Sequence, residues 1–284
     1  MACILTSALA VCVALAGCTL ETSPDTALTS SLSDDATLNS GVLVVGVNSS
    51  NVPYGGSGSS GELIGFDVDL AGAIGDELGV KVSIVDVSSN GRKALTNEQA
   101  DVVLGVTKSG TGDRYAYSTS YLSDGATVFS LQGHACESAD KVNLDKSGVI
   151  VQADTESAAE VQDALGLKNV DATSTLQEAF EALLDREERY LVADAAIGSY
   201  FARDYSRVVR IGYISSASVK PIYAMTLSEN EELTEAIDEA IQTVSENGEL
   251  RVIASKWLGS EGVALMPANV DTDSLPETAF GLWD

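Results

Sequence analysis

The stretch from Gly61 to Val80 reads GELIGFDVDLAGAIGDELGV. Apolar side chains recur along Leu70–Leu78 at the spacing of one helical face, which predicts a helix with one buried side. Asp67 can cap its start and Gly79 can end it. The next residues, Val80–Val87 (VKVSIVDV), alternate and are β-branched, so they predict a strand. This stretch therefore indicates a helix that leads into a strand.

Two further apolar runs flank this unit. Val42–Val47 (VLVVGV) and Asp101–Val106 (DVVLGV) are typical of buried strands, with a short helix expected at Arg92–Glu98. Strand, helix, strand, helix, strand within one short segment favours a parallel sheet with right-handed crossovers. Ligands bind beyond the carboxyl ends of the strands in such sheets.

A second run of the same kind follows. Strands are expected at 148–152, 189–196, 208–212 and 221–226, with amphipathic helices between and after them. The sequence thus predicts an α/β fold with two units. No element is assigned to residues 260–284.

The charge of the chain excludes several classes of protein. Its 284 residues include 42 acidic and 16 basic ones, a formal net charge of −26. Nucleic-acid binding and adsorption to anionic lipid both need clustered Lys and Arg, so neither is expected. The single histidine and four cysteines exclude a multi-histidine metal site and a zinc site of paired CxxC motifs. No metal and no cofactor are predicted.

The N-terminus predicts export. Ala2–Gly17 is uncharged and mostly apolar, but short for a membrane-spanning helix. Leu15-Ala16-Gly17-Cys18 resembles a bacterial lipobox, in which the cysteine becomes the lipidated first residue. We therefore expect a lipoprotein signal peptide at 1–17, lipidation of Cys18 and a flexible tether rich in Ser, Thr and Asp at 18–40. An uncleaved membrane anchor is the alternative. Both hold the protein outside the cytoplasm.

The order of segments resembles the family 3 extracellular solute-binding proteins, the amino-acid-binding components of ABC importers. The most specific pieces are GELIGFDVDLAGAIGDELGV and, far away in sequence, ENGELRVIASKWLG at Glu246–Gly259. The resemblance covers Gly41–Gly259. It implies a two-lobe periplasmic-binding-protein-like fold with two crossover strands and a central ligand cleft that closes by a hinge motion. Lobe 1 would be 41–131 plus 223–259, and lobe 2 would be 132–222.

The resemblance also implies roles for single residues. Asp194, at the end of the strand YLVADA, lies where the family places the carboxylate that pairs with the ligand ammonium; the alternative is a helix cap. Thr155 matches the lobe 2 site for the ligand carboxylate, or is an ordinary N-cap, and both roles can hold at once. Tyr54 matches an aromatic platform for the ligand side chain, or is a buried tyrosine. Thr107 matches a hydroxyl residue at the end of the third strand.

Two positions depart from the family pattern. Asn48 stands where family members often have Asp, which weakens the case for a cationic ligand. Arg114 is the expected partner of the ligand carboxylate, but the Pro-Glu that usually precedes it is replaced by a glycine-containing stretch, and it comes two residues late. Either Arg114 still reaches the cleft, or Lys108 replaces it, or the carboxylate site is altered. Asp113 and Arg114 as solvated loop charges are the remaining interpretation.

The resulting prediction is a monomeric, lipid-anchored receptor that delivers an amino acid to an ABC permease and is not an enzyme. Two alternatives stay open. One is an enzyme on the same fold, such as a dehydratase of cyclic carboxylic acids, although no general acid is singled out by the sequence. The other is a surface adhesion or signalling domain with a vestigial cleft.

Overall fold

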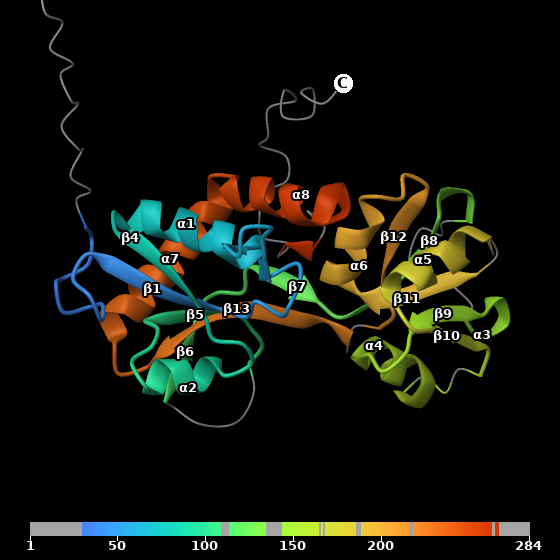
Figure 1. Cartoon of the computed structure of the whole chain (residues 1–284), viewed down its shortest axis with the longest axis horizontal. Helices are drawn as coiled ribbons and strands as arrows, with labels where there is room; N and C mark the ends of the chain where they lie inside the picture. Colours follow the sequence, from blue (N-terminus) through green and yellow to red (C-terminus); the bar gives the residue numbers. More distant parts are fainter. Residues whose placement is uncertain are drawn as a thin grey trace, which may run out of the picture.

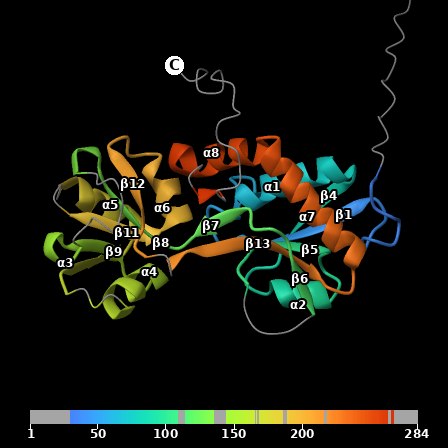
Figure 2. The same cartoon turned by 180° about the vertical axis from the view of Figure 1, so that it is seen from behind.

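The computed structural model describes residues 30–108, 114–134, 144–164, 166, 168–185, 189–215, 218–262 and 265–266. Two α/β lobes lie side by side and are joined by two strands that run between them (Figures 1 and 2). This confirms the predicted two-lobe α/β fold.

Lobe 1 is built on a sheet in the order β4-β1-β5-β13-β6. Its strands are β1 (Val42–Val47), β4 (Lys81–Asp86), β5 (Val102–Val106), β6 (Tyr115–Tyr117) and β13 (Lys220–Leu227). The first three are parallel, and β13 is antiparallel to β5 and β6. The hairpin of β2 (Gly56–Ser57) and β3 (Leu63–Ile64) precedes α1 (Phe66–Leu78), which packs with α7 (Glu231–Glu246) and α8 (Glu249–Gly262) on one face. The short α2 (Gly91–Thr96) covers the other face.

Lobe 2 has a sheet in the order β10-β9-β11-β8-β12. Its strands are β8 (Ala126–Leu131), β9 (Val149–Gln152), β10 (Val170–Thr173), β11 (Tyr190–Asp194) and β12 (Val208–Tyr213). Helices α5 (Leu176–Asp185) and α6 (Ala195–Ala202) pack on one face, and α4 (Glu156–Ala159) packs on the other. A single turn, α3 (Leu144–Ser147), precedes β9.

We call the crossing of the two connecting strands the hinge. The short β7 (Leu122–Asp124) pairs antiparallel with the first residues of β13, with Asp124 opposite Lys220. Gly125 follows at a φ of 121°, and a Cβ there would lie 1.8 Å from the carbonyl oxygen of Ser218, so the crossing requires glycine.

This crossing corrects the predicted lobe boundary at residue 131. Strand β8 pairs with β11 and β12, so it belongs to lobe 2, and the chain changes lobe at Gly125. The apolar run ATVFSL suits either sheet. Pattern alone therefore did not show which sheet it joins.

The predicted tether is also shortened. Leu32 and Ala36 are buried against lobe 1, and the backbone N–H of Ser33 donates to Glu232 at 2.7 Å. The segment from residue 30 to residue 40 therefore packs on lobe 1. The predicted signal peptide, Cys18, the rest of the tether and nearly all of the tail from 263 onward lie outside the described residues. Among the residues that are described, no helix is long and apolar enough to cross a membrane.

The start of α1 differs from its prediction as well. Gly65, not Asp67, is the N-cap residue. Asp67 lies in the first turn with its side chain buried, where it accepts a hydrogen bond from the Tyr121 hydroxyl at 2.7 Å. The ring of Tyr121 stacks on that of Phe66, the residue directly before Asp67, with centroids 6.0 Å apart.

Candidate functional site

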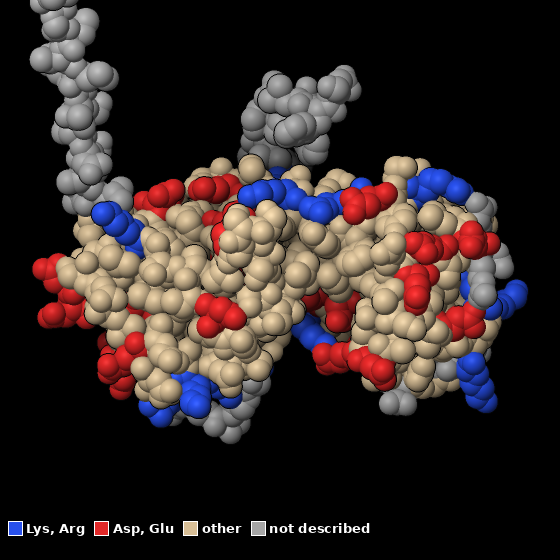
Figure 3. All heavy atoms as spheres, viewed as in Figure 1, with Lys and Arg blue, Asp and Glu red and all other residues tan. Residues whose placement is uncertain are grey.

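The molecule is hollowed between its lobes on the side of α2 and α4, and acidic and basic side chains gather there (Figure 3). Strands of both sheets end at this region. In lobe 1, Asn48 follows β1 and Thr107 follows β5; in lobe 2, Thr155 lies shortly after β9 and Asp194 ends β11. Four of the predicted site residues therefore stand at the carboxyl ends of parallel strands, where such sheets bind ligands.

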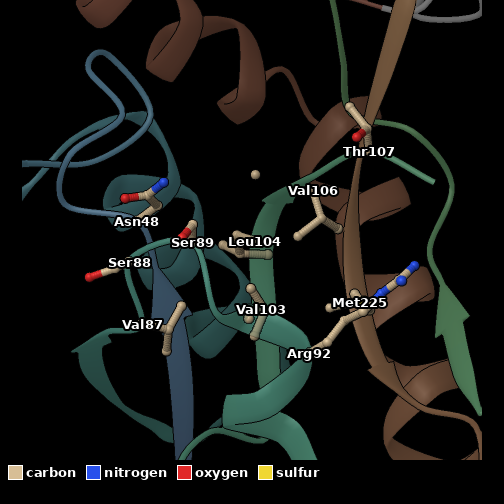
Figure 4. Close-up of a pocket in the computed structure, with 12 residues that line it drawn as sticks. Asn48, Val87, Ser88, Ser89, Arg92, Val103, Leu104, Val106, Thr107 and Met225 are labelled. Carbon is tan, nitrogen blue, oxygen red and sulfur yellow. The ribbon is translucent and has the colours of Figure 1, made fainter. Parts of the chain in front are cut away.

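Lobe 1 contributes a polar cavity of about 290 Å³. Asn48, Ser88 and Ser89 lie on one side of it and Thr107 on the other, with Leu104 between them (Figure 4). The hydroxyl and amide groups can hydrogen-bond a polar ligand. Ser88 and Ser89 were not predicted from the sequence, because a short serine run before a helix is indistinguishable from an ordinary loop.

Two cations border this part of lobe 1. The Lys108 ammonium lies 4.3 Å from the ring centroid of Tyr223 and 5.7 Å from that of Tyr117. The Arg92 guanidinium donates to the Tyr117 hydroxyl at 3.1 Å and also lines the cavity. Cation–π contacts of this kind hold an exposed lysine in place while leaving its charge available to an anion.

Arg114 lies elsewhere. It is exposed, and its carbonyl accepts a hydrogen bond from the backbone N–H of Ser228. Strand β13 pairs Tyr223 with Val106, next to Thr107, whereas Leu227 pairs with Tyr115, next to Arg114. Four residues of strand separate these positions, roughly 13 Å. The structure thus brings Lys108, but not Arg114, beside Thr107.

Lobe 2 presents Asp194 at the start of α6. Its side chain is half-buried, makes no capping hydrogen bond, and accepts one from the Ser157 hydroxyl at 2.5 Å. Thr155 is the N-cap of α4: its hydroxyl accepts from the Ala158 N–H at 3.2 Å and donates to the Gln152 carbonyl at 2.9 Å. Asp194 therefore keeps acceptor capacity for a ligand, while the Thr155 hydroxyl already has two partners.

Tyr54 lies at the hinge rather than on an open wall. Its side chain is buried, its ring meets Phe66 edge-on at 6.4 Å, and its hydroxyl donates to Asp124 at 2.8 Å. Burial, together with the charge of Asp124, raises the pKa of Tyr54.

Asp124 and Lys220 are hinge residues that sequence reasoning missed. They face each other across the β7–β13 pair, and the Lys220 ammonium lies 2.6 Å from the Glu156 carboxylate, beside Thr155. The one available signal for Asp124 was an acid next to glycine within an apolar run. Among the described residues, no group of three His, Cys, Asp or Glu side chains is placed to hold a metal ion.

Comparison with known proteins shows which family the chain resembles. Residues 43–260 match the sequence model of the bacterial extracellular solute-binding proteins, family 3. The chain is 26% identical over 258 residues to the L-cystine-binding protein TcyJ of Escherichia coli K12, an alignment that covers 81% of this chain and 89% of TcyJ.

Two solved structures are similar over most of the chain. The ancestral cationic amino acid solute-binding protein AncCDT-1 aligns with a TM-score of 0.64 and 25% identity, covering 77% of this chain and 96% of its own. The L-cystine solute receptor of Neisseria gonorrhoeae in its unliganded open conformation aligns with a TM-score of 0.65 and 19% identity, covering 78% and 93%. The chain belongs to the bacterial extracellular solute-binding proteins of family 3.

Proposed function

We propose that this protein is a lipid-anchored extracytoplasmic receptor that binds an amino acid, or a similar small zwitterion, between its lobes and delivers it to an ABC import permease. The proposal is supported by one cation and one acid after the carboxyl ends of strands in the two lobes, Lys108 beside Thr107 after β5 and Asp194 at the end of β11. A buried zwitterion needs both, since an unpaired charge removed from water is strongly unfavourable.

In this proposal Asp194 pairs with the ligand ammonium. Lys108, with the Thr107 hydroxyl, receives the carboxylate; Arg114 remains the prediction from family resemblance and is tested against Lys108 below. Thr155 helps to shape the lobe 2 side of the site.

The side chain of the ligand would enter the lobe 1 cavity. Asn48, Ser88 and Ser89 line this cavity, so a side chain with hydrogen-bonding groups fits better than a purely aliphatic one. The names of TcyJ and AncCDT-1 point to L-cystine and cationic amino acids as the first ligands to try.

Isothermal titration calorimetry with the twenty proteinogenic L-amino acids and L-cystine tests this function. We expect at least one ligand with a Kd at or below about 1 μM, near −8 kcal/mol. Asp194→Ala should abolish that binding. Asp204→Ala, at an exposed position two residues beyond the end of α6, is the matched control and should bind as wild type does.

Each failure has a distinct meaning. If wild type binds and Asp194→Ala binds equally well, the assignment of the ammonium site is wrong. If no compound binds, the receptor function is wrong. Turnover of a cyclohexadienyl carboxylic acid would instead support the enzyme alternative.

The anchor is tested separately. Mass spectrometry of the protein from the membrane fraction should find a lipidated Cys18 at the mature N-terminus, and Cys18→Ala should leave the chain unlipidated. An unmodified Cys18 in a membrane-bound chain would favour an uncleaved anchor.

A further inference from the structure

Asp124 holds together segments that are far apart in the sequence. Its Oδ2 accepts a hydrogen bond from the Tyr54 hydroxyl at 2.8 Å, and its Oδ1 accepts from the N–H groups of Gly125 at 2.8 Å and Ala196 at 3.0 Å. The side chain is half-buried on the hinge strand β7. Burial raises the pKa of Asp124, and the three hydrogen bonds act in the opposite direction by stabilising its carboxylate.

These donors belong to both lobes. Tyr54 is part of the lobe 1 core and packs on Phe66. Ala196 lies in the first turn of α6, the lobe 2 helix whose first residues reach into that core. The N–H of Ala195 donates to the Gly125 carbonyl at 2.9 Å, so two consecutive residues of that turn are attached to the hinge. The Asp124 carboxylate therefore adds a polar tie to the first turn of α6, whose Ala195 and Ala196 also pack in the lobe 1 core.

The residue directly before this turn is Asp194. Its backbone is set by the same attachment, and β11 pairs Asp194 with Ala126, two residues beyond Asp124, so the two acids are near neighbours. Two neighbouring carboxylates attract a cation more strongly than one does. Lys220, opposite Asp124, already pairs with Glu156, which leaves the local charge negative.

We propose that Asp124 is a positioning residue of the ammonium site: it fixes the first turn of α6, and Asp194 with it, to lobe 1 through Tyr54, and its charge adds to that of Asp194. The role of Asp124 in ligand binding rests on the proposed function, whereas the hydrogen bonds that tie α6 to Tyr54 are present without ligand.

Hydrogen–deuterium exchange of the full chain without ligand measures the tie directly. In Asp124→Ala, amides 195–199 should exchange about tenfold faster than in wild type, because a hydrogen bond to a charged acceptor is lost. Tyr54→Phe, which removes only the cross-lobe bond, should give a smaller increase. Asp124→Asn keeps an acceptor of the same shape and should restore protection.

Tyr121→Phe is the matched control. It deletes a hydroxyl that donates to a buried carboxylate, Asp67, entirely on the lobe 1 side. It should leave the exchange of amides 195–199 unchanged. Wild-type exchange of these amides in both Asp124→Ala and Tyr54→Phe would overturn the tie, and the milder Tyr54→Phe keeps the test decisive if Asp124→Ala does not fold.

Titration of the variants with L-cystine, L-arginine and the other L-amino acids tests the link to binding. Affinity for whichever compound binds wild type should fall about tenfold or more in Asp124→Ala and recover only partly in Asp124→Asn, which lacks the charge. Unchanged affinity in Asp124→Ala despite faster exchange would overturn the positioning role. Faster exchange with no ligand for wild type would leave the tie standing and reject the proposed function instead.

Discussion

The two lobes share a strand order and differ in what they bury. Three parallel strands lie side by side in each sheet, in the order β4-β1-β5 in lobe 1 and β10-β9-β11 in lobe 2. The next strand in each sheet is antiparallel and connects to the hinge: β13 in lobe 1 and β8 in lobe 2. Lobe 1 buries the carboxyl groups of Asp67 and Asp101, whereas the buried polar side chains described in lobe 2 are hydroxyls. One topology therefore supports a core that responds to pH and a core that does not.

The lobe 2 core is instead rich in aromatic contacts. Phe180 is fully buried and lies 5.1 Å from the ring of Tyr205, 6.0 Å from Phe201 and 6.1 Å from Phe129. Such contacts are insensitive to protonation, so the comparison predicts that the two lobes lose stability under different conditions.

The largest expected effect is that of Phe180→Ala. Removing this ring should lower the free energy of unfolding of lobe 2 by about 3–5 kcal/mol through lost burial and the cavity left behind. Urea denaturation followed by circular dichroism should show an early transition. In a Trp283→Phe background, the fluorescence of Trp257 on α8 reports lobe 1, which should unfold at a higher urea concentration. Coincident transitions would mean that the lobes unfold as one unit.

The second effect separates the lobes by pH. Burial raises the pKa of Asp67 from 3.8 to about 7, although the hydrogen bond from Tyr121 acts in the opposite direction. The folded chain thus holds this proton more tightly than the unfolded chain. The contribution of Asp67 to the free energy of unfolding is complete below about pH 4 and is lost as the pH rises to about 7. This change is on the order of a few kcal/mol.

Asp67→Asn should therefore flatten the pH dependence of lobe 1 stability. Wild type should lose several degrees of Tm between pH 4.5 and pH 8, and the variant should lose less. Burial raises the pKa of Asp101 too, so some dependence should remain. An equal loss of Tm in both proteins would contradict the role of Asp67.

The third effect concerns the cation that lobe 1 supplies. Lys108→Met should weaken ligand binding about tenfold or more, because it removes the charge beside Thr107 and keeps the length of the side chain. Arg114→Met is the matched comparison and should change the affinity little. Calorimetry on both variants decides between the two residues, and the reverse result would support the family-based prediction for Arg114.

The smallest effect belongs to the ion pair beside the hinge. The Lys220 side chain is 31% exposed and that of Glu156 is 73% exposed, so water weakens their attraction. Glu156→Gln should change the free energy of unfolding by less than about 1 kcal/mol. A larger loss in urea denaturation would show that this pair supports lobe 2 structurally.

Much of the fold followed from apolar periodicity. The strand at Val42–Val47 and the helix through Leu78 were predicted within about one residue, since buried faces dictate both patterns. The lobe boundary was not predicted correctly, because the sequence of β8 does not indicate which sheet it joins. The packing of Leu32 was missed for a related reason: one apolar residue in a polar segment has no period.

The candidate site followed less completely. Asn48, Thr107 and Asp194 stand at strand ends as expected, because strand ends can be read from the sequence. The placement of Arg114 depends on a loop whose length changed, and the contacts of Tyr54 depend on Asp124, which is 70 residues away. Contacts across such separations are set by tertiary packing and leave no local pattern.

The packing of residues 30–40 and of α8 on lobe 1 has a mechanical consequence. Both described ends of the chain leave from the same lobe, while lobe 2 is an insertion connected through β7, β13 and the packing of α6 on α8. A force applied to either end of the chain would therefore act directly on lobe 1. That force would reach lobe 2 through the two crossing strands and through α6, whose C-cap residue Arg203 donates to the carbonyl of Lys256 on α8.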